Sequence, residues 1–300
     1  MKQLAGLPTP EELKNQLKLK VSKNNNIGAI LRGEDSRLLL IIGPCSVHDP
    51  DAVIEYAHKL VDLAQYASGK VLIVMRVYTA KPRTDCKGFL GMLHQQNGLY
   101  NARKLHLDIL EQTGLHTADE LLYPALLPYF DDLLSYFAIG ARSVENQEHR
   151  LVASGMSVPV GMKNPLSGDL APMYAAVSAA KSPHGFIYRD CMVQTDGNPL
   201  AHGILRGGAT PNYQLEYLAG LTEPVIVDVS HGNSGKNPLL QQEIAMDVLK
   251  SRKSQPLVRG LMVESFLKGG KGNAYGQSVT DPCLSWEDTE ILIMKMLEHL

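Results

Sequence analysis

Short apolar runs that alternate with longer stretches of helical periodicity constrain the fold of this chain more than any other feature of its sequence. Such short runs are typical of buried strands, and a regular alternation with helices predicts parallel strands joined by crossover helices. Eight of them lie at residues 38–42, 71–77, 120–123, 138–141, 158–162, 185–188, 225–229 and 260–263. Eight parallel strands close into a barrel. The sequence therefore predicts an α/β fold, the (β/α)8 TIM barrel.

Helices are predicted between and after these strands, at residues 50–66, 97–112, 127–136, 144–153, 169–180, 212–219, 238–251 and 286–300. Upstream, Thr9-Pro10-Glu11-Glu12 combines a capping residue, a proline at the first helical position and a glutamate at the third. This pattern predicts a helix that runs to about residue 20, and a second helix is predicted at residues 22–32. We interpret residues 1–36 as an N-terminal extension that packs on the barrel or on a neighbouring subunit, and residues 37–300 as the barrel.

The charge of the chain is nearly balanced, with 29 Lys and Arg against 31 Asp and Glu and a net charge of -2. This balance argues against a nucleic acid or a membrane surface as the main partner. The start of the chain lacks the pattern of a signal peptide, and no apolar run is long enough to span a bilayer. The four cysteines, Cys45, Cys86, Cys191 and Cys283, are widely spaced, which favours a reducing compartment. We expect a cytoplasmic protein.

Positive side chains gather where the predicted strands end, which is the face that carries the active site of a (β/α)8 barrel. They are Arg76, Lys81, Arg83, Arg142, Lys163 and Arg206. Because the chain as a whole is slightly negative, six cations on one rim predict bound phosphates or carboxylates. The backbone N–H groups of Arg206-Gly207-Gly208 are a further candidate phosphate contact. Two long connections on this face, residues 79–96 and 189–208, are also predicted to carry function.

Four candidate metal ligands occupy the same rim. They are Cys45, His231, Glu264 and Asp281. Taken singly, a cysteine is more simply a buried apolar group and a histidine a hydrogen-bonded structural residue. Their shared position at one barrel end favours a single mixed site. A thiolate and an imidazole suit a borderline transition metal, while carboxylates keep Mn²⁺ competitive, so we expect one divalent ion, Mn²⁺, Fe²⁺, Co²⁺ or Zn²⁺, whose identity the ligands leave open.

At these residues the sequence resembles the class I 3-deoxy-D-arabino-heptulosonate 7-phosphate (DAHP) synthases, the phospho-2-dehydro-3-deoxyheptonate aldolase family. The resemblance covers about Arg37 to the C-terminus and is carried by Ile41-Ile42-Gly43-Pro44-Cys45-Ser46, Met75-Arg76-Val77-Tyr78, Lys81-Pro82-Arg83-Thr84, Ile139-Gly140-Ala141-Arg142, Leu205-Arg206-Gly207-Gly208, Asp228-Val229-Ser230-His231, Met262-Val263-Glu264-Ser265 and Thr280-Asp281. It implies a metal-dependent transferase that condenses phosphoenolpyruvate with erythrose 4-phosphate and releases phosphate. That reaction is the first step of the shikimate pathway to chorismate and the aromatic amino acids. A homo-oligomer, dimer or tetramer, is implied as well.

The resemblance also implies a role for each residue of the rim. The implied metal ligands are Cys45, His231, Glu264 and Asp281, of which Cys45, His231 and Asp281 also count, with Lys81, as the catalytic group. The implied substrate contacts are Arg142, Lys163 and Arg206 at the phosphoenolpyruvate phosphate, Ala141 beside them, Arg76 and Lys81 at the carboxylate, Arg83 and Thr84 at the aldose phosphate, and Glu120 near the reacting carbons. Either Lys81 or a metal-held water would protonate the new alkoxide.

Two alternatives remain open. A related synthase joins phosphoenolpyruvate to arabinose 5-phosphate, and barrel-end loops can change the aldose phosphate without changing the fold. Its lysine loop typically reads Lys-Ala-Asn-Arg, whereas this chain has Lys81-Pro82-Arg83-Thr84. The second alternative is a catalytically inactive barrel with a regulatory or scaffolding role. The complete set of candidate ligands and cations disfavours it.

Overall fold

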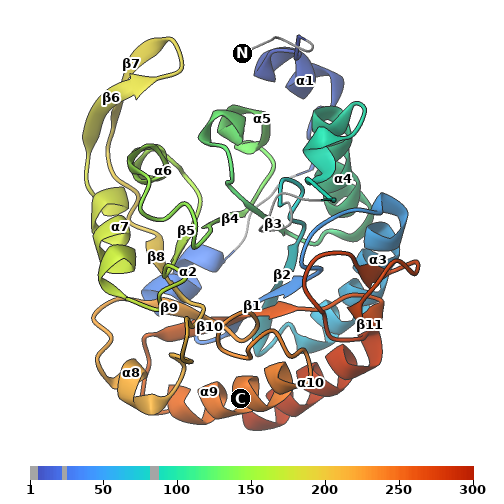
Figure 1. The fold of residues 1–300 in the computed structure, drawn as a ribbon, viewed down its shortest axis with the longest axis vertical. Coiled ribbons are helices and arrows are strands. Elements are labelled where there is room, and N and C mark those ends of the chain that lie inside the picture. The colour runs from blue at the N-terminus through green and yellow to red at the C-terminus, as the bar shows by residue number, and fades with distance from the viewer. Residues whose placement is uncertain (1–5, 22–25, 82–87) are drawn as a thin grey trace.

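The computed structural model of the chain, which describes residues 6–21, 26–81 and 88–300, contains a closed barrel of eight parallel strands (Figure 1). In order around the barrel the strands are β1 (Leu38–Gly43), β2 (Val71–Arg76), β3 (Thr117–Glu120), β4 (Tyr136–Ile139), β5 (Val160–Lys163), β8 (Ala201–Leu205), β9 (Val225–Asp228) and β10 (Val258–Glu264). The barrel closes because β10 pairs with β1 in parallel register. The predicted (β/α)8 barrel is confirmed.

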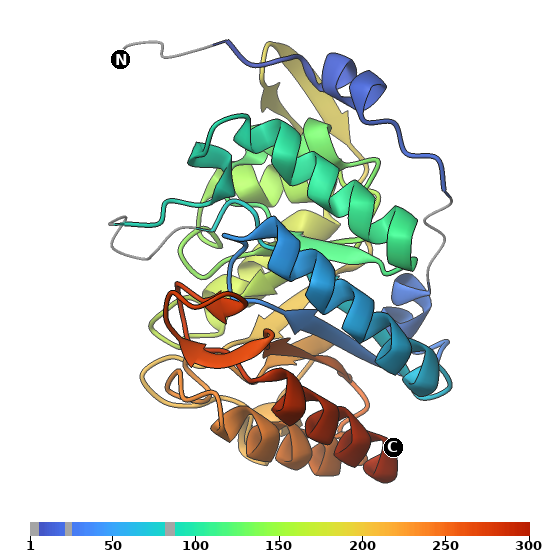
Figure 2. The same ribbon diagram turned by 90° about the vertical axis from the view of Figure 1, so that its right-hand side faces the viewer.

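Helices surround this barrel. They are α3 (Pro50–Ala67), α4 (Gly98–Thr113), α5 (Leu127–Phe130), α6 (Gln147–Ser154), α7 (Ala171–Lys181), α8 (Leu215–Ala219), α9 (Leu240–Arg252) and α10 (Trp286–His299). Figure 2 shows α3 and α4 side by side on one flank of the barrel. The start of α3 illustrates how the sequence defines a helix, because Asp49 accepts hydrogen bonds from the first-turn N–H groups of Asp51 and Ala52 and Pro50 occupies the first helical position.

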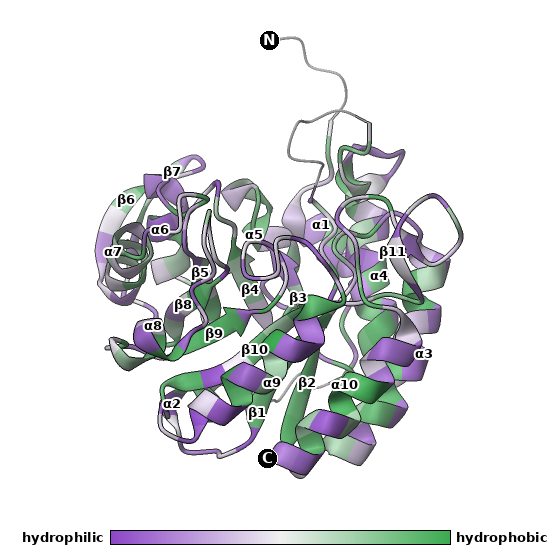
Figure 3. Cartoon of the chain, turned by 60° about the horizontal axis from the view of Figure 1, so that its bottom comes forward, coloured by the Kyte–Doolittle hydropathy of each residue, from purple (hydrophilic) through white to green (hydrophobic). Residues whose placement is uncertain are grey.

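The core has two parts because neighbouring residues of a strand face opposite sides. In β1, Leu38, Leu40 and Ile42 pack between the barrel and the helices, while Leu39 and Ile41 pack inside the barrel. Strands buried on both faces read as continuous apolar runs, which is how β1, β2 and β9 stand out in green in Figure 3.

The N-terminal segment lies against the barrel and its surrounding helices. Helix α2 (Ile27–Arg32) packs its Ile27, Ile30 and Leu31 into the interior cluster of the barrel. Helix α1 (Pro10–Gln16) is followed by Leu17, whose carbonyl accepts a hydrogen bond from the buried Arg103 of α4 at 2.9 Å. Among the described helices, none is both long and apolar enough to cross a membrane.

The prediction of a barrel strand at residues 185–188 was wrong. That run forms β6 (His184–Tyr188), which pairs with β7 (Cys191–Thr195) in an antiparallel hairpin outside the barrel (Figure 1). The sixth barrel strand is β8, within the connection that was predicted to be a long loop. His202 and Gly203 of β8 weaken its apolar pattern, but the whole strand is buried and His202 forms a hydrogen bond with Tyr136 at 2.8 Å.

Several boundaries also differ from prediction. The third strand was predicted at residues 120–123, but Glu120 ends β3 instead of beginning it. The predicted helix at residues 127–136 is the single turn α5, and Tyr136 already belongs to β4. Helix α1 ends at Gln16, and α2 begins at Ile27. Aspartate and glutamate are poor strand formers, but the tertiary contacts of β3 override that propensity.

Candidate active site

A cationic cavity of about 130 Å³ opens at the end of the barrel where the strands terminate. Its lining residues are Lys81, Glu120, Gly140, Ala141, Arg142, Lys163, Leu166, Arg206, His231, Lys236 and Asp281. Five of them are Lys or Arg and two are carboxylates. Eight of the predicted site residues thus share one cavity, although they come from seven strand ends and the loops after them. Such a cavity suits a small molecule with more than one negative charge.

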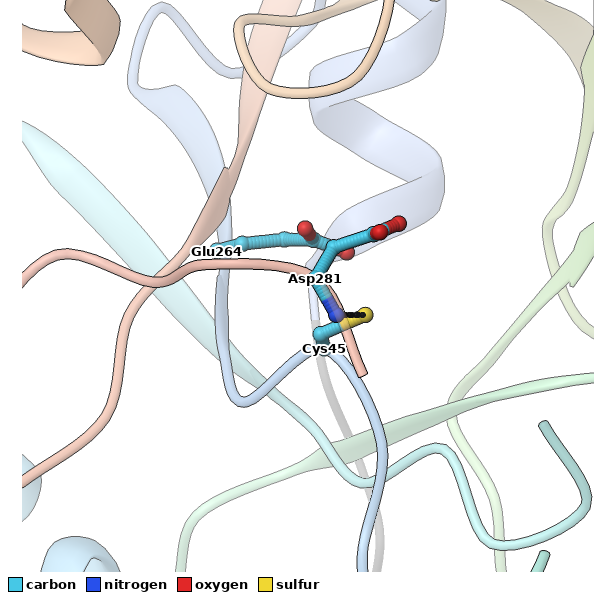
Figure 4. A group of neighbouring side chains, drawn as sticks. All are labelled: Cys45, Glu264 and Asp281. Atoms are coloured by element: carbon cyan, nitrogen blue, oxygen red, sulfur yellow. Dashed lines mark hydrogen bonds between the residues drawn. The ribbon is translucent and has the colours of Figure 1, made fainter. Parts of the chain in front are cut away.

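Three of the four candidate metal ligands form a compact group beside this cavity. One ligand atom each of Cys45, Glu264 and Asp281 lies within 4.8 Å of the other two (Figure 4). The register of β1 and β10 produces this group, because Gly43 pairs with Glu264 and Cys45 follows two residues later. Asp281 donates its backbone N–H to Cys45 Sγ at 3.4 Å. Burial, together with the neighbouring Glu264, raises the pKa of the Cys45 thiol.

His231 stands next to that group, with its Nε2 3.3 Å from Glu264 Oε1. Its other ring nitrogen, Nδ1, bonds to Asp228 Oδ2 at 2.9 Å, so Nε2 is the nitrogen presented to the ligand atoms. Burial lowers the pKa of His231, although Asp228 and Glu264 oppose the shift. A neutral imidazole with a carboxylate behind it is the usual form of a metal-binding histidine.

Asp228 is a functional residue that sequence reasoning missed. It is fully buried and accepts hydrogen bonds from His231, from Ser230 and from Lys163 Nζ, the last at 2.8 Å. Burial opposes its ionisation, but the charges of His231 and Lys163 outweigh that effect and hold its pKa well below the usual value. The available signal was a carboxylate three residues before a candidate ligand, in Asp228-Val229-Ser230-His231.

Lys81 reaches into the ligand group. Its Nζ lies 3.2 Å from Cys45 Sγ, 3.2 Å from Glu264 Oε1 and 3.4 Å from His231 Nε2. Burial works against a charged ammonium, but Cys45 and Glu264 outweigh it and raise the pKa of Lys81 above its ordinary value. Lys81 is therefore an ammonium ion at the boundary between the ligand atoms and the cavity.

Arg76 lies behind this group and does not line the cavity. Its guanidinium is fully buried and donates from Nη2 to Glu264 Oε1 at 3.0 Å, while the guanidinium carbon lies 3.9 Å from the centre of the Tyr78 ring. Within the described part of the chain, Nη1 is buried without a hydrogen-bond partner. A buried, unpaired N–H group on a permanent cation is a natural contact for a bound anion.

The predicted role of backbone N–H groups at Arg206-Gly207-Gly208 was wrong. Arg206 N donates to Asn164, Gly207 N to Asn212 and Gly208 N to the Thr210 carbonyl, so all three are already bonded within the protein. The turn brings the guanidinium of Arg206 to the cavity instead. It requires glycine at position 207, since φ is 74° there and a Cβ would lie 2.4 Å from Asn233 N.

Glu120 and Lys236 add two further charged side chains to the cavity. Glu120 ends β3 with its carboxylate against Gly140, where an added Cβ would meet Oε1 at 2.0 Å. Arg83 and Thr84 lie outside the described residues. Lys236 was not predicted, yet it lines the cavity and its Nζ contacts Asp281 Oδ1 at 2.9 Å.

Residues 14–294 match the model of the DAHP synthetase I family. The chain belongs to this family. Its members include a Trp-sensitive phospho-2-dehydro-3-deoxyheptonate aldolase of Escherichia coli O6:H1, which is 42% identical to this chain in an alignment that covers 90% of this chain and 86% of that protein. A Tyr-sensitive one of Escherichia coli K12 is 40% identical in an alignment that covers 98% of this chain and 93% of that protein.

A solved structure of the family agrees with the whole fold. The phospho-2-dehydro-3-deoxyheptonate aldolase from Francisella tularensis SCHU S4 superimposes with a TM-score of 0.93 at 35% sequence identity, covering 100% of this chain and 98% of that one. The family resemblance expected from the rim motifs is confirmed. The Trp-sensitive and Tyr-sensitive members are almost equally similar to this chain, at 42% and 40% identity, so family membership assigns no effector to it.

Proposed function

We propose that this chain is a 3-deoxy-7-phosphoheptulonate synthase, which condenses phosphoenolpyruvate and erythrose 4-phosphate into DAHP and inorganic phosphate at the start of aromatic amino acid biosynthesis. Membership of the DAHP synthetase I family supports the reaction class. The observation that carries the proposal is the cavity of five cations directly beside the Cys45, Glu264 and Asp281 group. That arrangement suits a doubly anionic substrate next to a metal-assisted reaction centre.

Different cations bind the two anionic groups of phosphoenolpyruvate, and others bind the aldose phosphate. Arg142, Lys163 and Arg206 bind the phosphate of phosphoenolpyruvate, and Ala141 lines the same wall. Lys81 and Arg76 bind its carboxylate, Arg76 by turning Nη1, which has no partner among the described residues, from behind the ligand group toward the cavity. Arg83 and Thr84 bind the phosphate of the aldose. Because the cations are held by the ends of rigid strands, they bind the anion in one orientation without first having to reorganise.

Cys45, His231, Glu264 and Asp281 would hold one divalent metal ion. The residues present fit this role, because three donor atoms lie within 4.8 Å of one another and the fourth residue turns Nε2 toward them. A set of sulfur, nitrogen and oxygen donors suits Mn²⁺, Fe²⁺, Co²⁺ or Zn²⁺. When bound there, the ion would polarise the aldehyde oxygen of the aldose.

The side chains of the cavity then donate and accept the protons of the reaction and stabilise its charges. Carbon 3 of phosphoenolpyruvate forms a bond to the aldehyde carbon, and Lys81 donates a proton to the alkoxide that results. Glu120 orients the water that adds to carbon 2 and takes up its proton. The hydroxyl on carbon 2 then becomes the ketone oxygen as the bond between carbon 2 and the phosphate oxygen breaks. The departing phosphate takes the electron pair of that bond and the hydroxyl proton, and Arg142, Lys163 and Arg206 stabilise it.

Compartment and assembly are proposed on separate grounds. The substrates are phosphorylated metabolites, and Cys45 must stay reduced to bind a metal ion, so we place the enzyme in the cytoplasm. A homo-oligomer, dimer or tetramer, is supported by the hairpin of β6 and β7, where the facing residues Ile187 and Met192 are 74% and 71% exposed. The molar mass in solution tests this assembly.

Phosphate release tests the reaction. Chelated enzyme is assayed with phosphoenolpyruvate and either erythrose 4-phosphate or arabinose 5-phosphate, before and after Mn²⁺ is restored. Turnover that requires Mn²⁺ and occurs with the four-carbon sugar is expected. Preference for arabinose 5-phosphate would assign the related eight-carbon synthase, and no release with either sugar would assign an inactive barrel.

A further inference from the structure

We propose that Lys81 is an internal cation that occupies the ligand atoms whenever the metal is absent, so that an entering metal ion must displace its ammonium group. The inference rests on the ligand set proposed above. It is drawn from three distances, since Lys81 Nζ lies 3.2 Å from Cys45 Sγ, 3.2 Å from Glu264 Oε1 and 3.4 Å from His231 Nε2. No other cation in the described part of the chain contacts three of these ligand residues.

Charge balance explains why the ammonium stays there. Glu264 is 1% exposed, and a buried carboxylate is stable only when paired. Arg76 and Lys81 both contact the same oxygen, Oε1. A divalent ion bonded to Cys45, His231 and Glu264 would bring two more positive charges to the atoms that Lys81 already contacts. The ammonium and the ion repel each other strongly at such short range in a buried site.

The displaced ammonium has a defined destination. Lys81 is itself a lining residue of the cavity, together with Arg142, Lys163 and Arg206. Moving away from the ligand atoms therefore moves its charge toward the site proposed for phosphoenolpyruvate. In this way metal occupancy sets the positive charge available to the anion, and the two ligands favour each other's binding through Lys81.

Metal affinity without turnover tests the proposal. Metal-stripped wild-type protein, Lys81→Met and Arg206→Met are titrated with Mn²⁺, and the free ion is counted by electron paramagnetic resonance. Arg206→Met is the matched control, because Arg206 lines the same cavity but donates to the Gly207 carbonyl and not to a ligand atom. We expect Lys81→Met to bind Mn²⁺ on the order of tenfold more tightly than wild type, and Arg206→Met to stay within about twofold.

A second measurement separates displacement from a general loss of structure. Without metal, Lys81→Met should melt at a lower temperature than wild type, and saturating Mn²⁺ should narrow that gap. Lys81→Gln, which keeps a neutral donor, replaces Lys81→Met if circular dichroism shows that the latter does not fold. If the folded variant binds Mn²⁺ as tightly as wild type or more weakly, the proposal that Lys81 competes with the metal is overturned, while the proposed ligand set stands. A wild-type protein that binds no Mn²⁺ overturns the proposed ligand set, and this inference with it.

Discussion

Asp228 Oδ2 accepts a hydrogen bond from Nδ1 of His231 at 2.9 Å, and this bond leaves Nε2 as the ring nitrogen that is turned toward the ligand group. The backbone supports the same orientation, because His231 has a φ of 51° and so adopts the left-handed conformation, which is uncommon outside glycine. Asp228 also holds Lys163 at 2.8 Å. One buried carboxylate therefore positions both a proposed metal ligand and a proposed phosphate contact.

Asp228→Asn is expected to weaken Mn²⁺ binding by roughly tenfold to a hundredfold, which is the usual loss when the partner behind a metal-binding histidine is removed. The neutral amide no longer stabilises the Nδ1–H form of His231. Isothermal titration of the metal-stripped variant measures the effect. Ser230→Ala is the matched control, since it removes a hydroxyl that contacts both Asp228 and His231 Nδ1 but leaves the carboxylate in place. Equal affinities for wild type and Asp228→Asn would contradict this role.

Gly207→Ala is expected to lower stability by about 1–3 kcal/mol and to reduce turnover, because the new Cβ would press on Asn233 and displace the neighbouring Arg206. Thermal melting measures the loss of stability, and kcat and kcat/KM for phosphoenolpyruvate measure the loss of turnover. Gly235→Ala is the control that separates steric collision of the new Cβ from the strain of a positive φ. Gly235 also has a positive φ, 57°, but nothing lies within 4 Å of its added Cβ. Equal losses in the two variants would show that conformation alone matters.

The buried His202 of β8 should make the stability of the protein depend on pH. Burial lowers the pKa of His202 from 6.5 to about 4. Between those two values the unfolded chain binds a proton that the folded protein does not, so stability falls as the pH is lowered through this window. From pH 7 to pH 5 the loss from this residue is about 2 kcal/mol.

His202→Gln removes this titration, while its amide can still bond to Tyr136. The melting temperature of the variant should therefore fall less between pH 7 and pH 5 than that of wild type. His58→Gln, a change at an exposed histidine, should retain the wild-type dependence. Parallel curves for wild type and His202→Gln would refute the assignment.

Arg103→Met is expected to destabilise the protein by about 1–3 kcal/mol for each buried acceptor that is left without its donor, the carbonyls of Tyr129 and Leu17. Arg103 is fully buried and donates to Asp132, to the Tyr129 carbonyl and to the Leu17 carbonyl, so it fastens the segment after α1 to the helical layer. Thermal unfolding of the whole chain measures the loss. Lys14→Met, which removes an exposed partner of Asp131, should cost less than about 1 kcal/mol. A similar loss in both variants would show that burial of the Arg103 guanidinium is not what stabilises this segment.

Sequence periodicity alone determined the class of fold and much of the site. Runs such as the one at residues 38–42 are apolar throughout because a strand of a parallel barrel is buried on both faces, and that property is local to the chain. The rule that strand ends converge on one rim then predicted that Lys81, Arg142, Lys163, Arg206, His231 and Asp281 would meet, as they do around the cavity.

Only the tertiary structure decided which run completes the barrel and how the charges pair. Strand β8 lies between β5 and β9 although His202 and Gly203 interrupt its apolar pattern, because Tyr136 from another strand provides the partner that His202 needs. The contacts of Asp228 with Lys163 and of Lys81 with Glu264 likewise join residues far apart in the chain. Barrel closure and strand register set those distances, and neither can be read from local periodicity.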